Sequence, residues 1–248
     1  MRLKSLLCLL LITLLISCDG DVETGNSAPM KREQRSAPVR GNGVVRGVVH
    51  LTGWTARQPP PQIVKCLGHS HDVKIEDETV VVNDGLLRDV VVYLKDAPAS
   101  DGSQEPPVLL DQVNCRYVPH VVAVQVGQTL RVRSSDATLH NVHMAPRDNA
   151  TVNFGMTGVG IRDLRFQTPE RIRVRCDVHP WMNADVVVLE NPFSAVSAAD
   201  GTFEIKGVPA GDYTLVASHG RLGNLEQKVT VTEAKPAEAG FEYKPPQP

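Results

Sequence analysis

The chain has 248 residues, and its 26 basic and 28 acidic side chains give a formal net charge of −2. Aromatic residues make up only 4% of it, and no cluster of basic residues stands out. This composition excludes a nucleic-acid binder, which needs a basic surface and aromatic side chains that stack on bases.

The N-terminus carries the pattern of a bacterial export signal. Arg2 and Lys4 precede an apolar run over residues 6–16. A membrane-spanning helix needs about 20 apolar residues, so this run is too short to span. It ends in Leu15-Ile16-Ser17-Cys18, which resembles the lipobox of bacterial lipoproteins. The resemblance implies that residues 1–17 are a signal peptide and that Cys18 is lipidated. The alternative is an ordinary signal peptide with an incidental cysteine.

Residues 18–42 follow as a polar stretch of Asp, Glu, Lys, Arg, Gly, Ser and Pro without an aromatic residue. Such a composition cannot bury a core, and it predicts a flexible tether behind the lipidated cysteine. We therefore expect a membrane-anchored lipoprotein of the cell envelope that faces the periplasm.

The cysteines beyond the signal and the lipid are Cys66, Cys115 and Cys176. An oxidising compartment allows two of them to pair. We expect a Cys66–Cys115 disulfide, which closes a loop of about 50 residues and stabilises the fold by roughly 4 kcal/mol in the chain-entropy model. Cys176 is then left as a free thiol.

Short β-branched segments separated by Gly and Pro turns fill the rest of the chain. They predict an all-β fold of sandwiches or barrels, long enough for two small domains. The expected strands are Val44–Leu51, Thr79–Val82, Val90–Leu94, Val121–Val126, Leu130–Val132, Ile172–Val174, Ala184–Leu189, Thr202–Ile205, Tyr213–Ala217 and Lys228–Val231.

The strongest motif is Cys176-Asp177-Val178-His179-Pro180-Trp181-Met182, with His140 lying upstream. A His₂Cys set with a weak axial Met is the donor set of blue-copper electron-transfer sites. A tight loop after one strand can supply Cys, His and Met, while the other His comes from a neighbouring strand. Zinc is the rival metal, but it has little use for a thioether.

This loop and His140-Asn141-Val142-His143 resemble the cupredoxin family, and within it the amicyanin and plastocyanin group. The resemblance covers about residues 107–190. It implies one type 1 copper held by His140, Cys176, His179 and Met182, with Asn141 stiffening the ligand loop. The departures are Val174 and Asn183-Ala184, where the family often has an aromatic residue and a glycine.

A second resemblance lies in residues 199–215, which are similar to the carboxypeptidase regulatory-like β-sandwich. That family's opening strands look like Val44–Leu51 and Asp89–Leu94. We expect residues 43–96 and 193–248 to form this sandwich, with a cupredoxin Greek-key sandwich or barrel over residues 97–192 inserted in it. The alternative is two unrelated modules in series. Pairing of Val44–Leu51 with strands after residue 200 favours insertion.

Three further histidine groups carry weaker metal signals. Cys66–His71 contains His69 and His71, but a polar loop beside a disulfide explains it as well. His143 is expected to be a packed or surface histidine. His120 and His219 have no pattern that assigns them to a site.

The expected function is one-electron transport. By the resemblance, His179 lies near the surface, and Pro180 and Trp181 form part of a docking patch for a redox protein such as a c-type cytochrome or a membrane oxidoreductase. The sequence has no C-x-x-C-H, H-E-x-x-H or G-x-S-x-G motif and no phosphate-binding glycine loop, so we do not expect an enzyme. Two alternatives stay open: a copper-handling protein, and a binding or scaffold module that copper stabilises.

Overall fold

The computed structural model describes residues 36–55, 59–66 and 72–245. Every regular element within these ranges is a β-strand, so the all-β fold class is confirmed. The described ranges contain no helix long and apolar enough to cross a membrane. The expected signal peptide, Cys18 and most of the tether lie outside them.

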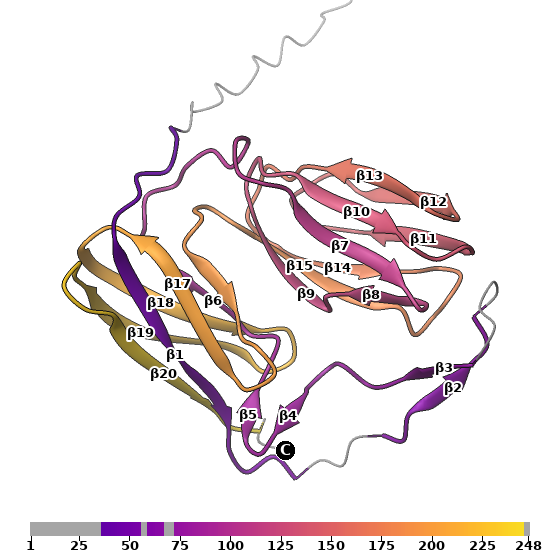
Figure 1. Cartoon of the computed structure of the whole chain (residues 1–248), viewed down its shortest axis with the longest axis horizontal. Helices are drawn as coiled ribbons and strands as arrows, with labels where there is room; N and C mark the ends of the chain where they lie inside the picture. The colour runs from indigo at the N-terminus through magenta and orange to yellow at the C-terminus, as the bar shows by residue number, and fades with distance from the viewer. Residues whose placement is uncertain (1–35, 56–58, 67–71, 246–248) are drawn as a thin grey trace, which may run out of the picture. The chain divides into compact units, whose positions relative to one another are not determined.

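A β-sandwich forms from strands near both ends of the described chain. Its strands are β1 (Gly43–Leu51), β4 (Val82–Asn83), β5 (Leu86–Leu87), β6 (Val91–Leu94), β16 (Ser194–Val196), β17 (Thr202–Val208), β18 (Gly211–His219), β19 (Gly223–Val231) and β20 (Ala237–Tyr243). One sheet has the order β17-β1-β5-β4, with β20 also paired to β1, and the other has the order β16-β6-β18-β19. Figure 1 shows indigo β1 beside the late strands β17 and β20.

β1 is held on both edges by strands from the other end of the sequence. It pairs antiparallel with β17 and parallel with β20. Gly47 lies opposite Ala239, and a Cβ on Gly47 would approach the Ala239 carbonyl oxygen to 1.4 Å. The close pairing of β1 with β20 therefore requires glycine at this position.

A second group of strands lies between β6 and β16, and we call it the inserted module (residues 108–189). Its strands are β7 (Val108–Val113), β8 (Arg116–Val118), β9 (Val121–Gln125), β10 (Leu130–Ser134), β11 (Leu139–Met144), β12 (Val152–Thr157), β13 (Gly160–Leu164), β14 (Arg171–Arg175) and β15 (Asn183–Leu189). They form two sheets, with the orders β13-β10-β7-β8 and β12-β11-β14-β15-β9. Many of these strands alternate buried and exposed residues, as β10 and β14 do.

The connectivity is that of an insertion. The chain leaves the sandwich after β6 and returns at β16, while β7–β15 pair with one another. β1 pairs with strands after residue 200, which is the pairing that insertion requires and that two modules in series do not.

The strand prediction from the sequence was wrong for one segment and did not include several strands of the structure. The segment Thr79–Val82 is a strand only from Val82, because the Asp77 carboxylate accepts the Thr79 amide at 2.8 Å and bends the chain before it. Asp84 and Gly85 have φ of 50° and 78°, and this turn joins β4 to β5. Among the missed strands, β11 is the one that matters for function.

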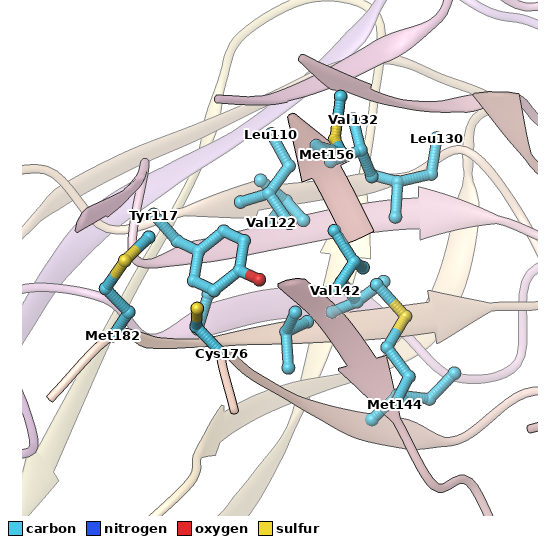
Figure 2. Packing of buried hydrophobic residues seen from close by; sticks show 14 of the residues in the cluster. Leu110, Tyr117, Val122, Leu130, Val132, Val142, Met144, Met156, Cys176 and Met182 are labelled. Atoms are coloured by element: carbon cyan, nitrogen blue, oxygen red, sulfur yellow. The ribbon is translucent and has the colours of Figure 1, made fainter. Parts of the chain in front are cut away.

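The sandwich and the inserted module each have a hydrophobic core, and a third, smaller cluster joins Val91 of β6 to Val121, Val187 and Leu189 of the inserted module. The core of the inserted module includes Cys176, Met182 and Tyr117, and Figure 2 shows their side chains at one end of it. A hairpin of β2 (Gln62–Val64) and β3 (Val73–Ile75) adds Val73 and Ile75 to that core.

Candidate metal centre

The candidate metal centre is built where β11 and β14 meet. The two strands pair at His143 with Arg175 and at Met144 with Val174, just beside the ligand loop that joins β14 to β15. The loop is closed by its own backbone. The Cys176 amide donates to the Met182 carbonyl at 3.1 Å, and the Met182 amide donates to the His179 carbonyl at 2.9 Å.

Three of the four predicted ligands present their donor atoms to one another. His140 Nδ1 lies 3.1 Å from His179 Nδ1, and Cys176 Sγ lies 3.7 Å from the same nitrogen. These three donor atoms all lie within 4.8 Å of one another, and all three residues are buried. Met182, the fourth predicted ligand, is 1% exposed and ends the loop.

These separations fit one shared metal ion. Metal–nitrogen bonds of about 2.0 Å and metal–sulfur bonds of about 2.3 Å in a trigonal or tetrahedral site separate nitrogen from sulfur by about 3.5–3.7 Å, and nitrogen from nitrogen by about 3.3–3.5 Å. The observed 3.7 Å and 3.1 Å need adjustments of a few tenths of an ångström. Two imidazoles and a thiol, together with the thioether that Met182 would supply from the end of the loop, form a donor set that suits copper.

Asp136 contacts the His140 ring on the side opposite the cage. Its Oδ2 lies 2.8 Å from His140 Nε2, and the carboxylate also accepts the amides of Asn114 and Cys115 at 2.8 and 2.9 Å. In the neutral ring the contact sets the tautomer, with the proton on Nε2 and the Nδ1 lone pair toward the site; in the protonated ring Nδ1 donates to Cys176. Asp136 is 3% exposed.

Asp136 and His140 each stabilise the charged form of the other. Burial raises the pKa of Asp136, but the Cys115 amide and the His140 side chain outweigh it and keep that pKa below its ordinary value. Burial lowers the pKa of His140, and hydrogen bonds with Cys176 and Asp136 more than reverse that effect. Sequence reasoning missed Asp136, because nothing in the residue itself distinguishes it from an aspartate in a turn.

Asn141 does what its position beside His140 predicts. Its amide donates to Cys176 Sγ at 3.3 Å, and its side-chain oxygen accepts the Asp177 amide at 3.2 Å. Its own Nδ2 is held by Asn153 at 2.8 Å. Burial raises the pKa of the Cys176 thiol, but hydrogen bonds from His140 and from the Asn141 amide outweigh burial and lower that pKa. The environment thus favours the thiolate, which is the form that binds metal.

The structure joins Cys66 to Cys115 by a disulfide, with their Cα atoms 6.1 Å apart, and leaves Cys176 free. The disulfide lies against the ligand loop: Cys115 Sγ is 4.0 Å from His179 Nε2. The indole Nε1 of Trp181 donates to the Cys115 carbonyl at 3.0 Å.

The side chain of His179, which was expected near the surface, is itself buried. His179 is 6% exposed, because the disulfide lies beside its Nε2 edge and the Trp181 ring packs against it. The centroids of the His179 and Trp181 rings are 5.2 Å apart. Of the two residues assigned to docking, Pro180 is exposed and Trp181 is half-buried.

No other histidine of the described residues belongs to the three-donor cage. His143 points away from it, and its Nδ1 contacts the Asp177 carboxylate at 2.9–3.0 Å. His120 and His219 are buried and line one pocket together, and His120 also lines a second pocket with Trp181 and Met182. His69 and His71 lie outside the described residues.

Residues 173–243 match the family model of the carboxypeptidase regulatory-like domain. The match begins in β14 of the inserted module and ends with β20 of the sandwich. No curated protein sequence matches the chain.

The solved structures similar to this chain include cupredoxins. A single-site mutant of amicyanin in its reduced state is 21% identical, with a TM-score of 0.32, over 40% of this chain and 98% of its own. A purple cupredoxin from Nitrosopumilus maritimus is 18% identical, with a TM-score of 0.29, over 34% of this chain and 100% of its own.

A copper-containing nitrite reductase from Thermus scotoductus is also similar. It is 16% identical, with a TM-score of 0.33, over 46% of this chain. The match spans only 26% of the reductase chain. At these identities the likenesses concern the fold alone.

Proposed function

We propose that the chain binds one type 1 copper ion through His140, Cys176, His179 and Met182 and carries single electrons. The observation that carries the proposal is the buried three-donor cage, in which two imidazole nitrogens and a free thiol converge. A copper ion held there would supply a one-electron couple between Cu(I) and Cu(II). The residues around it would hold the donors still, so that little rearrangement accompanies a change of charge.

The rigidity comes from contacts that do not depend on metal. Asp136 fixes the His140 ring, Asn141 fixes the Cys176 sulfur, and the two backbone hydrogen bonds across the loop fix His179 and Met182. A cage of this kind limits the reorganisation that slows electron transfer.

We further propose that the protein is a lipoprotein of the cell envelope, anchored by Cys18 and facing the periplasm. Its redox partner would be a c-type cytochrome or a membrane oxidoreductase that docks near Pro180 and Trp181. A small apolar contact with a polar rim suits the brief encounters of redox proteins. In this proposal the chain turns over no substrate.

The buried edge of His179 gives a specific reason to keep the copper-handling alternative. An electron carrier gains from an open ligand edge, and here the disulfide covers that edge. A protein that only holds copper needs no such opening.

Stopped-flow reduction of the copper-loaded full chain separates the two functions. Mixing the Cu(II) form with a one-electron donor should bleach the visible band rapidly, and one-electron oxidation should restore it without loss of metal. Slow reduction, together with ready transfer of copper to a chelator of moderate affinity, would instead establish the copper-handling function.

A further inference from the structure

The two nitrogens of His179 face two different sulfur groups. Nδ1 lies 3.7 Å from Cys176 Sγ, inside the cage. Nε2 lies 4.0 Å from Cys115 Sγ, on the opposite side of the ring. One buried imidazole therefore separates the copper site from the Cys66–Cys115 disulfide.

In the disulfide form the two sulfur atoms of the outer group are bonded to each other, and reduction would free two thiols beside His179. The sulfur atoms of Cys66 and Cys115 and Nε2 of His179 lie within 4.8 Å of one another, and all three residues are buried. A trigonal ion with the bond lengths given above separates nitrogen from sulfur by about 3.7 Å. The 4.0 Å between Cys115 and His179 is within a few tenths of an ångström of that value.

The backbone holds Cys115 in place whether or not its sulfur is bonded to Cys66. Asn114 and Cys115 form the two-residue turn between β7 and β8, with φ of 52° and 51°. Asp136 accepts both of their amides, and the Trp181 indole donates to the Cys115 carbonyl. Neither contact involves the disulfide, so the position of Cys115 beside His179 survives its reduction.

We propose that the dithiol form of Cys66 and Cys115 binds a second soft metal ion, Cu(I), with His179 Nε2 as the third donor. Reduction by a dithiol compound supplies two electrons and two protons to the S–S bond, and the reductant becomes a disulfide. Binding of Cu(I) then releases the two thiol protons to solvent and, where the inner copper is bound to Nδ1, also the Nε2 proton of His179, so that the ring bridges the two ions as an imidazolate. Thiolates favour soft ions such as Cu(I) over hard ones, and an imidazole suits copper.

The second site makes copper content depend on thiol redox state. The disulfide form retains the cage of His140, Cys176 and His179 but has no free sulfur at the outer site. Oxidation of the two thiols removes the principal donors of the outer ion beside the inner cage. The proposal shares His179 with the proposed function, but its two sulfur donors are separate.

Anaerobic Cu(I) titration of the full chain, with and without prior reduction by a dithiol compound, tests the proposal. A competing chelator reports the bound copper, and alkylation followed by mass spectrometry reports the protection of each cysteine. The reduced protein should bind one equivalent more than the oxidised protein, and the added equivalent should protect both Cys66 and Cys115. A Cys66→Ser/Cys115→Ser variant should bind the same amount with and without reductant.

The outcomes keep the two sites distinct. Equal copper binding in the two redox forms, or alkylation of Cys66 and Cys115 at full Cu(I) loading, would overturn the second site. Absence of copper from the oxidised protein, with one equivalent in the reduced protein at Cys66 and Cys115, would overturn the type 1 site and leave the second standing.

Discussion

Replacement of Asp136 by asparagine tests how the protein holds and tunes the ligand His140. The carboxylate accepts three N–H donors, from His140, Asn114 and Cys115. An asparagine keeps the shape but turns one oxygen into an NH₂ group. In either orientation, this NH₂ faces at least one of the three donors.

The structural cost of Asp136→Asn follows from that count. Each lost hydrogen bond to a charged acceptor is worth about 1.5–3 kcal/mol. Loss of a carboxylate that supports a metal-bound histidine lowers metal affinity by about 10- to 100-fold. We therefore expect weaker copper binding by that factor, and a lower free energy of unfolding for the metal-free protein.

The electrostatic effect has a definite sign. The Asp136 carboxylate lies 2.8 Å from His140 Nε2, one imidazole ring away from the cage. A unit charge about 7 Å from the metal, at an effective dielectric constant of about 20, interacts by about 2.4 kcal/mol. Its removal disfavours Cu(II) relative to Cu(I), which raises a one-electron potential by about 100 mV.

Spectroelectrochemistry of the copper-loaded variant and the wild type measures this shift, and competition with a chelator measures the affinity. Asn141→Ala is a matched comparison, because it removes contacts to the ligand loop without removing a charge. An unchanged or lower potential in Asp136→Asn would refute the assignment of Asp136 as the charged support of His140.

Three further changes test the fold and the surroundings of the site. Burial and the nearby Arg171 lower the pKa of His219 to about 4, below its ordinary value, so the unfolded chain takes up protons first as the pH falls. Between pH 7 and pH 4.5 this difference in proton uptake lowers the free energy of unfolding by roughly 2 kcal/mol. Urea unfolding should show that decrease in the wild type and a smaller one in His219→Gln. Equal decreases in the two proteins would contradict the role of His219. Gly47→Ala should lower the urea concentration at which the sandwich unfolds, because the new Cβ would lie 1.4 Å from the Ala239 carbonyl oxygen. Gly240→Ala is the control: its Cβ would lie 3.5 Å from the nearest atom, so it should have little effect. Trp181→Phe removes the hydrogen bond to Cys115, so it should speed reduction of the disulfide by a thiol; an unchanged rate would show that this contact does not hold the turn.

The donor set of the site could be predicted from the sequence because one short loop contains most of it. Cys176, His179 and Met182 are spaced for a single turn between two strands, and that spacing is independent of the rest of the fold. His140 could be assigned as a ligand because it and Asn141 resemble the segment that carries the first ligand in the cupredoxin family. The structure places His140, Cys176 and His179 within one cage.

The surroundings of the site could not be predicted in the same way, because they depend on distant pairings. Asp136 and the β7–β8 turn come together only when β10 pairs with β7, and that turn sets Cys115 beside His179. The burial of the His179 side chain could not be predicted for this reason. The strand β11 was missed because the inward-facing His140 is polar and the exposed Leu139 is apolar, which reverses the expected apolar–polar alternation at the start of the strand.

The insertion of one module in the other was visible only as two similar segments on either side of the copper motif. Long-range pairing decides it. β1 is joined to β17 and β20 across nearly the whole sequence, and no local signal in residues 43–51 specifies those partners.

Copper titration of the full chain, followed by visible absorption and electron paramagnetic resonance, tests the central claim most directly. The account predicts one equivalent of copper with an intense blue band and a narrow hyperfine splitting, both lost in Cys176→Ser. A colourless protein, or ordinary tetragonal copper spectra that Cys176→Ser leaves unchanged, would contradict the ligand set and favour the scaffold function.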